Sequence, residues 1–395
     1  MTHESQFFLD HLGQTSPFPF LIEVDRAEGA YIFDKQGKAY LDMIAGVAVN
    51  NIGHRHPKVI AALKTQLDKH LHVMVYGEFI QDAQQQLVRE LLTVLPVNLN
   101  GVYVVNSGTE AIEAALKLAK RVTGRTELVA FKGSYHGSTH GAMSVSANEV
   151  KKIAFRPLLP DVRFLPHNEI AALEQITPRT AGVIIETIQG DAGVRRPSAA
   201  FMHALRARCT AVGALLIFDE IQCGMGRAGT MFAFEQFDVV PDILALGKAL
   251  GGGMPIGALV SAQQHLKTFT HAPMLGHITT FGGHPMVCAA AAATVQVLRT
   301  EIDWSLLEQR AAAFAAQITA HPAVQNHRRV GAMFAFDLSS AEAVEKVVQY
   351  CLEQGLITFW FLSHPYSFRL SPPLNLAKKD WDLAAKVIIS ALDRL

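Results

Sequence analysis

The sequence predicts an α/β protein in which a mostly parallel central sheet forms a large domain and a smaller α+β domain follows. Short apolar runs alternate with helical stretches through the middle of the chain, and such runs are typical of strands buried on both faces. The 395 residues exceed the length of about 250–300 at which a single core usually divides. Half of the residues are apolar and only 18% are charged, which excludes a disordered chain.

The first expected feature is a β-hairpin near the N-terminus. Two alternating runs, 30–34 and 39–42, flank a turn that contains Gly37. Apolar residues at helical spacing then predict one helix over 57–69 and a second over 83–95.

From residue 101 onward, strands and helices are expected to alternate. Short apolar runs mark the strands, at 102–105, 128–131, 183–185, 214–218 and 243–246. Helical patterns occupy 110–122 and 199–212. Because parallel strands need crossover connections, usually helices, this order favours a parallel sheet.

After about residue 289 the pattern changes to helices around a second sheet. Sheet-like segments are expected at 332–337, 355–361 and 368–370. We therefore predict three parts. Residues 1–50 form an arm with the hairpin and pack on the small domain, 51–288 form the large domain, and 289–395 form the small domain.

Charge and composition exclude several classes of protein. Lys+Arg and Asp+Glu balance at 35 each, so no bulk field attracts nucleic acid or an anionic membrane. The four cysteines form no CxxC, which favours a reducing compartment. The start of the chain lacks the basic region of a signal peptide, and the apolar stretch 286–298 is too short to span a bilayer. We expect a cytoplasmic protein without a metal site, since the histidine pairs lack zinc-site spacing.

Polar residues follow four of the expected strands directly. They are Ser107-Gly108-Thr109, Glu186, Asp219 and Lys248. In an open parallel sheet, ligands bind beyond the carboxyl ends of the strands. We therefore expect these residues to gather around a ligand, because burying charges at one edge is costly unless they pair or bind something.

Each of these residues also has an ordinary structural interpretation. The Ser107–Thr109 turn opens a helix and suits either a phosphate or a simple N-cap. Asp219 is either a cap or salt-bridge partner, or an acid that holds a proton on a buried ring nitrogen. Lys248 is either a surface lysine in a glycine-rich loop, or a desolvated amine that condenses with an aldehyde. Taken together, a phosphate cradle, an acid and an amine suit pyridoxal 5′-phosphate.

Longer motifs carry a resemblance to a known family. They are Asn106–Ala111, Gly133–Gly137, Glu186–Gly193, Asp219–Arg227, Leu246–Gly253 and Thr279–Pro285. In this order and spacing, the chain resembles the class III aminotransferases of fold type I, nearest to the acetylornithine/ornithine aminotransferase branch, over about residues 29–376. The resemblance implies that the large domain binds pyridoxal phosphate.

By this resemblance, three residues are catalytic. Lys248 forms a Schiff base with the cofactor and later moves a proton on the substrate. Asp219 pairs with the ring nitrogen. Glu186 is the acid beside the cofactor that orients neighbouring groups.

The resemblance also implies a cofactor-binding set and a homodimer. Gln222 would bond the ring oxygen, Tyr135 would stack on the ring, and His136 would lie beside it. Ser107, Gly108 and Thr109 would hold the phosphate. Thr280 of the other subunit would complete the phosphate site.

The expected substrate residues are Arg369, Asp191 and Ser138. Arg369 matches an arginine that binds an α-carboxylate, and Asp191 matches an acid that masks this arginine, although a purely structural Arg–Asp pair is the alternative. Ser138 stands where the branch has a second arginine, and Val47 where ornithine-specific members have tyrosine. We therefore expect an amine donor other than ornithine, with acetylornithine as the default, or else a substrate carboxylate bound by a residue that the sequence does not identify.

The predicted function is transfer of an amino group from an amine or ω-amino acid to a 2-oxo acid by a ping-pong mechanism. An aminomutase or racemase of the same fold is the alternative. A non-catalytic cofactor-binding protein is a third interpretation, which intact Lys248 and Asp219 disfavour.

Overall fold

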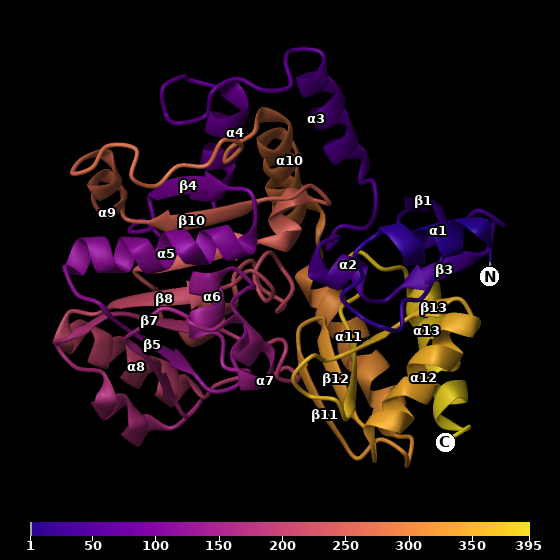
Figure 1. Cartoon of the computed structure of the whole chain (residues 1–395). Coiled ribbons are helices and arrows are strands. Elements are labelled where there is room, and N and C mark those ends of the chain that lie inside the picture. The colour runs from indigo at the N-terminus through magenta and orange to yellow at the C-terminus, as the bar shows by residue number, and fades with distance from the viewer. Residues whose placement is uncertain (1) are drawn as a thin grey trace.

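The α/β architecture is confirmed by a computed structural model that describes residues 2–395 (Figure 1). A seven-stranded sheet with the order β4-β10-β9-β8-β7-β5-β6 forms its centre. Its strands are β4 (Gly101–Val105), β5 (Glu127–Phe131), β6 (Val162–Leu165), β7 (Thr180–Glu186), β8 (Leu215–Asp219), β9 (Ile243–Gly247) and β10 (Gly257–Ser261).

Strand β10 is the exception in an otherwise parallel sheet. It runs antiparallel to both β4 and β9, while the remaining pairs are parallel. Because β10 reverses the direction twice, β4 and β9 point the same way. The carboxyl ends of β4, β9, β8 and β7 therefore meet at one edge. The sequence analysis missed β6 and β10.

Alternate residues of the strands face two different cores. Ile184, Ile217 and Ala245 belong to a buried cluster with α5 (Gly108–Thr123) and α6 (His140–Val145). Their neighbours along the strands belong to the larger core, which includes α8 (Ala199–Val212). This core also contains α3 (Pro57–Leu67) and α4 (Asp82–Leu92), which both pack on α10 (Pro285–Glu301). The sheet is thus buried on both faces, as its apolar runs predict.

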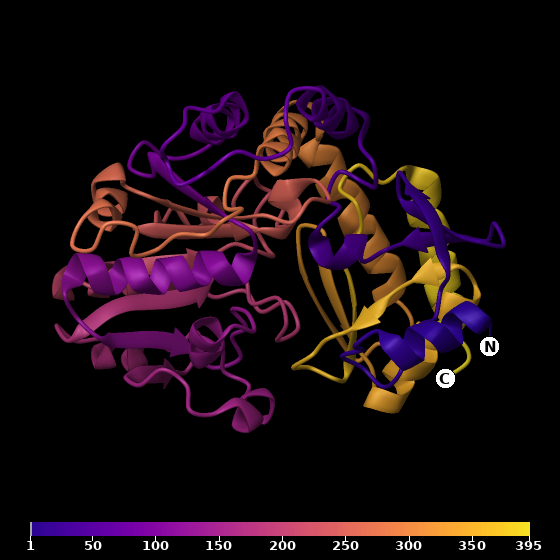
Figure 2. The same cartoon turned by 45° about the horizontal axis from the view of Figure 1, so that its top comes forward.

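A second sheet with three helices forms the C-terminal part, the right-hand lobe of Figure 2. Its strands have the order β11-β12-β15-β14. The elements are β11 (Asn326–Val330), β12 (Met333–Asp337), β14 (Phe359–Trp360), β15 (Ser367–Leu370), α11 (Trp304–Thr319), α12 (Ala341–Glu353) and α13 (Lys378–Leu392). The rings of Phe314, Phe334 and Trp381 join sheet to helices, with centroids 5.0–6.0 Å apart.

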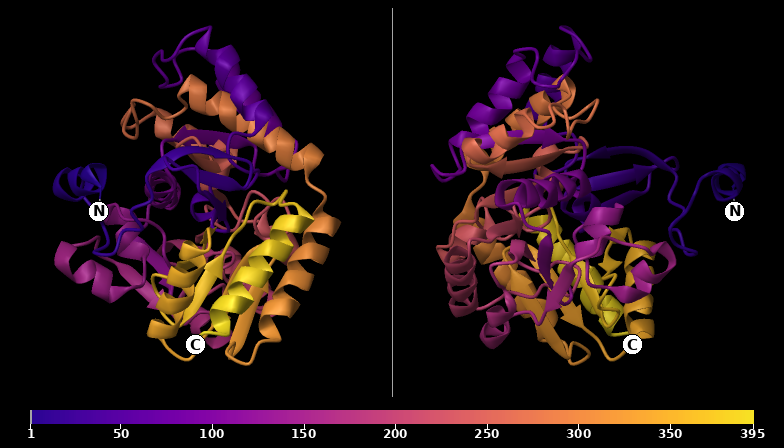
Figure 3. Two further views of the ribbon diagram at one scale, coloured as in Figure 1. Left: turned by 90° about the vertical axis from the view of Figure 1, so that its right-hand side faces the viewer. Right: turned by 60° about the vertical axis from the view of Figure 1, so that its left-hand side comes forward.

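The N-terminal segment forms a third, small sheet that also uses C-terminal residues. The predicted hairpin is present, and the strands of this sheet have the order β1-β2-β3-β13. Its strands are β1 (Val24–Glu28), β2 (Tyr31–Asp34), β3 (Ala39–Asp42) and β13 (Leu356–Ile357). Strand β13 runs parallel to β3, and the Tyr31 hydroxyl donates to Asp380 of α13. Helix α1 (His3–His11) projects to one side (Figure 3).

The remaining elements are short. They are α2 (Ala45–Ala48), α7 (Glu149–Lys152), α9 (Gln263–Leu266) and 3-10 turns at Ile153–Phe155, Ile170–Gln175, Ala233–Phe237, Lys248–Gly251 and Lys267–Thr270. No helix among residues 2–395 has the length and apolar character needed to cross a membrane. The boundary predicted between residues 288 and 289 falls inside α10, and the division into three parts stays a prediction.

The turn between β11 and β12 packs closely against the backbone of residues 228–229. A substitution in this turn can therefore test that contact. Gly331 has φ +54, and a Cβ there would collide with backbone atoms of Ala228 and Gly229. We expect Gly331→Ala to lower the free energy of unfolding by about 3 kcal/mol or more, since backbone cannot give way. Gly124→Ala is the matched control, because Gly124 has φ +68 with open space around it. We expect Gly124→Ala to lower the free energy of unfolding, measured with urea, by only about 1 kcal/mol. Equal losses would contradict the contact.

Candidate active site

Three predicted catalytic residues lie on adjacent strands of the central sheet. Glu186 ends β7, Asp219 ends β8, and Lys248 directly follows β9. In the strand register Glu186 lies opposite Asp219, and Asp219 lies opposite Ala245. The charges of both acids act on the lysine amine. The structure therefore brings together the residues that follow separate apolar runs in the sequence.

Lys248 occupies a strained and buried position. Its φ of 43° lies in the left-handed region, which costs an L-residue about 1–2 kcal/mol. Burial lowers the pKa of its amine, and nearby Arg369 lowers it further, whereas Asp219, Glu186 and Asp191 raise it. Among residues 2–395, no hydrogen bond or ion pair engages its Nζ. A larger fraction of the amine is therefore neutral, and available as a nucleophile, than for an ordinary lysine.

The Asp219 carboxylate is held by two donors. Its Oδ2 lies 2.7 Å from Nδ1 of His136, and its Oδ1 accepts from the amide of Ile221 at 3.0 Å. The His136 amide in turn donates to Oγ of Ser146 at 2.8 Å. Since an ionised carboxylate only accepts, His136 carries its proton on Nδ1. Its Nε2 is buried and has no hydrogen-bond partner among residues 2–395. His136 thus fixes the direction of Asp219.

Glu186 holds the loop that carries Tyr135 and His136. Its two carboxylate oxygens accept from the amides of Tyr135 and Gly190, each at 2.9 Å. Burial raises the pKa of Glu186 to about 7; His136 opposes this rise, and Asp219 adds to it. This carboxyl therefore titrates near neutral pH, in the range that suits proton exchange.

The predicted phosphate cradle lies directly against the lysine segment. Ser107 caps α5, and its Oγ accepts from the amide of Glu110 at 3.3 Å. The next two positions pack tightly. A Cβ on Gly108 would lie 2.8 Å from Ile221, and one on Gly247 would lie 3.2 Å from the Cα of Gly108. Only glycine allows the start of α5 to approach Lys248 so closely.

The hydroxyl groups around this cradle bond to one another. Oγ1 of Thr109 lies 2.8 Å from Oγ1 of Thr139, and a Cβ on Gly137 would collide with Thr109. The Tyr135 hydroxyl lies 3.1 Å from Oγ of the exposed Ser138. The Tyr135–Thr139 loop thus lines the cradle.

Gln222 and Thr280 have different positions. Gln222 packs against Gly190, where a Cβ would collide with its amide, and so reaches the Glu186 loop. Thr280 is exposed on the segment before α10. Among residues 2–395, no hydrogen bond joins Thr280 to the other predicted site residues.

The predicted carboxylate-binding arginine is buried and unpaired. Arg369 on β15 is 7% exposed and lies over the rings of Phe359 and Phe361, at 5.5 and 5.7 Å. Its Nε has no partner, and burial lowers its pKa. Asp191 forms no ion pair with it within 4.0 Å in the described chain, so the structural Arg–Asp pair is not formed.

Asp191 is engaged by the small domain instead. Its carboxylate accepts from the amide of Leu362 at 3.0 Å and from the Ser363 hydroxyl at 2.7 Å. These bonds lie across the boundary between the two lobes. Asp191 thus holds the loop that precedes β15 close to the sheet edge.

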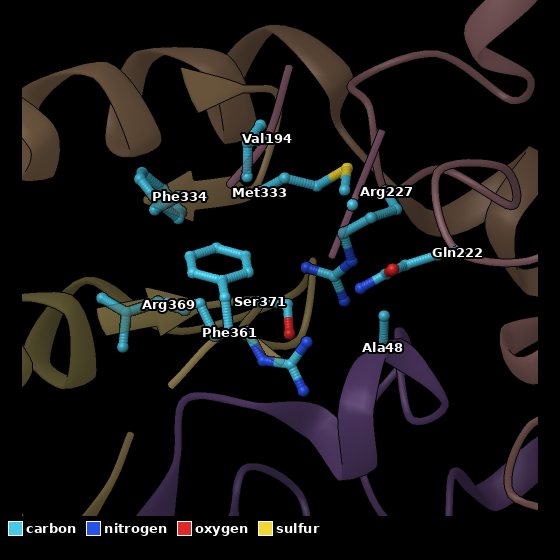
Figure 4. Close-up of a pocket in the computed structure, with 11 residues that line it drawn as sticks. Ala48, Val194, Gln222, Arg227, Met333, Phe334, Phe361, Arg369 and Ser371 are labelled. Carbon is cyan, nitrogen blue, oxygen red and sulfur yellow. The ribbon is translucent and has the colours of Figure 1, made fainter. Parts of the chain in front are cut away.

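A small pocket between the lobes joins two predicted residues to one that the sequence analysis gave no role. Figure 4 shows the predicted Gln222 and Arg369 around it, together with Arg227. Arg227 is fully buried and donates to the carbonyls of Ala332 and Pro372, at 3.1 and 2.6 Å, and to Oδ1 of Asn51. Burial lowers its pKa to about 9. In the sequence, Arg227 is the only charged residue between positions 221 and 234, and this isolation among uncharged residues is the signal that could have indicated it.

Another missed feature is the turn of α2. Residues 45–48 all have positive φ, between 48° and 65°. The turn is anchored by Oδ1 of Asp42, which accepts from the amides of Ile44 and Ala45 at 2.9 Å. It brings Ala48 to the pocket. Such left-handed turns are rare for L-residues, and no pattern in the sequence indicates one.

Comparisons with known proteins give consistent results. The sequence profile described as Aminotransferase class-III matches residues 13–392. Acetylornithine aminotransferase of Methanopyrus kandleri is 41% identical over 292 residues, 74% of this chain and 73% of that protein. Putrescine aminotransferase of Pectobacterium atrosepticum is 37% identical over 383 residues, 92% and 80% of the two chains. The solved ornithine aminotransferase of Toxoplasma gondii has a TM-score of 0.90 at 28% identity, covering 100% of this chain and 96% of that one.

The raised pKa of Glu186 predicts a titration near neutrality. The ordinary value is 4.5 and the folded value about 7, so the folded chain holds this proton more tightly. Its stabilising contribution is complete below pH 4.5 and is lost as the pH rises through about 7. In infrared difference spectra we expect a carboxylic-acid band that disappears with a midpoint near pH 7 and is absent from Glu186→Gln. Glu345→Gln, a change at an exposed site, should retain it. If the band disappeared already at the pH at which ordinary carboxyl groups lose their proton, the assignment to Glu186 would be contradicted.

Proposed function

The chain belongs to the class III aminotransferases, and from this premise we propose that it binds pyridoxal 5′-phosphate covalently through Lys248. As a member of this family it transfers amino groups from an amine to a 2-oxo acid. The observation that carries the cofactor proposal is the buried Lys248 amine, which no hydrogen bond or ion pair engages among residues 2–395, in a segment that packs against the start of α5 and beside the strand that ends in Asp219. We further propose that the reaction follows a ping-pong order.

The residues at the sheet edge fit the three reactive parts of this coenzyme. An aldehyde needs an amine with a lowered pKa, which Lys248 supplies. A pyridine nitrogen that carries a proton needs a buried carboxylate, which is Asp219. A phosphate needs free N–H groups and hydroxyls at a helix start, which Ser107, Gly108 and Thr109 provide.

Bound there, pyridoxal phosphate supplies an electron-withdrawing ring for the carbon that carries the amino group. Lys248 would remove and return a proton at that carbon as general base and acid. Asp219 would keep the ring nitrogen protonated, while His136 holds Asp219 in place. Tyr135 would lie against the ring and Gln222 would donate to its oxygen, while Glu186 holds the loop that carries Tyr135.

We also propose a homodimer in which Thr280 completes the phosphate site of the other subunit. Support comes from the exposure of Thr280 and of the apolar side chains Ile278 and Phe281 on the same segment. Such a group is typical of a surface that another protein covers. The four buried, unpaired cysteines support a cytoplasmic location.

Arg369 is the proposed carboxylate-binding residue for substrates. It is buried, unpaired at Nε and lines the pocket between the lobes. Asp191 would mask its charge when an amine without that carboxylate binds, and Ser138 offers a hydroxyl in place of a second cation. Named relatives differ in their donors, acetylornithine and putrescine among them, so we propose an amine or ω-amino acid donor of this kind.

The first test removes the amine. We expect Lys248→Ala to lower kcat for amino transfer by about 10³-fold or more, because both the covalent bond and the proton transfer are lost. After borohydride reduction and digestion, mass spectrometry should find the coenzyme on the peptide that contains Lys248. Lys346→Ala, a change at an exposed site, serves as the control. Full activity of Lys248→Ala would contradict the proposal. Continued turnover of a donor without any oxo acid would instead indicate an aminomutase or racemase.

A second test concerns Arg369. Lysine keeps the charge but loses the planar fork that bonds a carboxylate twice. We expect Arg369→Lys to lower kcat/KM about 10- to 100-fold for donors with an α-carboxylate, and far less for diamines. Arg179→Lys, which is exposed, should change neither. An equal loss with both kinds of donor would show that Arg369 acts only on the fold.

A further inference from the structure

Helix α6 starts with a cap that another helix supplies. Thr139 is its N-cap residue, but the Thr139 side chain accepts no hydrogen bond from the first turn of α6. Instead, Oε1 of Glu113 on α5 accepts from the amides of Gly141 and Ala142, at 2.9 and 3.1 Å. A Cβ on Gly141 would collide with this carboxylate, so α6 packs closely on α5 (Figure 1). The first-turn amides of a helix have no partner within their own helix, and a carboxylate is a strong acceptor for them.

The same carboxylate oxygen sets the direction of two further hydrogen bonds. The Thr139 hydroxyl donates to Oε1 of Glu113. Since a hydroxyl has one hydrogen, Thr139 can only accept in its contact with Thr109, whose Oγ1 lies 2.8 Å away. The Thr109 hydroxyl therefore donates to Thr139, and it accepts in turn from the Thr139 amide at 3.3 Å. The bonds form a chain from Thr109 through Thr139 to Glu113.

This chain joins the start of α5 to the loop that carries Tyr135. Thr109 is the second residue of α5, and Glu113 lies one turn further along the same face of the helix. A Cβ on Gly137 would collide with Thr109, so the loop lies directly on the helix start. Two residues earlier in the loop, the amide of Tyr135 donates to Glu186. Glu113 and Glu186 thus hold the two ends of one loop.

The way in which the start of α5 is held sets the direction of its free N–H groups. A phosphate bonds to several such groups at once, so a small shift of the first turn weakens all of these bonds together. Oε1 of Glu113 already accepts from three donors, and these bonds fix the carboxylate in one orientation.

We propose that Glu113 is a positioning residue for the phosphate of the coenzyme. Through Thr139 it holds Thr109 and the first turn of α5 in the orientation that a bound phosphate needs. This inference rests on the proposed function, because it concerns the phosphate site of the same coenzyme. Glu113 acts through its geometry and not through its charge, since a carboxylate repels a phosphate.

Coenzyme binding with and without the phosphate tests this role. Pyridoxal has the ring and the aldehyde of pyridoxal phosphate but lacks the phosphate. In titrations of the full chain freed of coenzyme, followed by Schiff-base absorbance, we expect Glu113→Ala to raise the Kd for pyridoxal phosphate about 10-fold or more. The Kd for pyridoxal should stay within about 2-fold, because no phosphate contact is lost. Glu345→Ala, the same change at an exposed position of α12, should match the wild type with both ligands.

Conservative variants separate geometry from charge and from folding. Glu113→Gln keeps an acceptor oxygen for the same donors, so its Kd for pyridoxal phosphate should stay within about 3-fold of the wild type. Thr139→Val leaves Glu113 on α6 and removes only the link to Thr109. We expect it to raise the Kd for pyridoxal phosphate, and not for pyridoxal, about 3- to 10-fold. Thr139→Ser, which keeps the hydroxyl, should match the wild type.

The outcomes distinguish this role from the proposed function. If Glu113→Ala and Thr139→Val lost equally with the two ligands, or lost nothing, the role of Glu113 would be overturned. Tighter binding of pyridoxal phosphate by Glu113→Gln would also overturn it, because the charge would then decide the affinity. A wild type that binds pyridoxal phosphate no better than pyridoxal would remove the phosphate site and this role with it. A wild type that keeps the preference but carries the coenzyme on a residue other than Lys248 would overturn only the proposed function.

Discussion

Lys248 lies in a left-handed turn at the end of β9. The groups around its ε-amine shift the pKa of that amine in opposite directions. Burial and Arg369 favour the neutral amine, whereas Asp219, Glu186 and Asp191 favour the ammonium. The strain of the turn is maintained because the flanking glycines let α5 and the lysine segment pack at van der Waals distance. The other features of the site follow from where this amine lies.

The two carboxylates at neighbouring strand ends have different hydrogen-bond donors. Asp219 receives a hydrogen bond from an imidazole and one from a backbone amide. Glu186 receives only backbone amides and is fully buried, and its pKa rises to about 7. Of the two, Glu186 is the acid whose pKa suits proton exchange near neutral pH.

The substrate side is assembled across the boundary between the lobes. Arg227 ties the lobes through Asn51, Ala332 and Pro372, and Asp191 holds the Leu362–Ser363 loop. These bonds place Arg369 close enough for its charge to act on Lys248, although the two residues belong to different sheets. Substrate recognition therefore depends on how the lobes pack, and the cofactor residues depend mainly on the central sheet.

The sequence alone determined the alternation of strands and helices and the residues at the strand ends. Apolar runs and the polar groups directly after them are local patterns, so Glu186, Asp219 and Lys248 were predicted together. Strand β10 was missed because it follows a glycine-rich turn, and the left-handed turn of α2 has no local signature. Only the tertiary structure decided that His136 bonds Asp219 and that Asp191 bonds the loop before β15. Each of these contacts joins residues far apart in the chain, and packing between sheets and loops fixes such contacts where periodicity cannot.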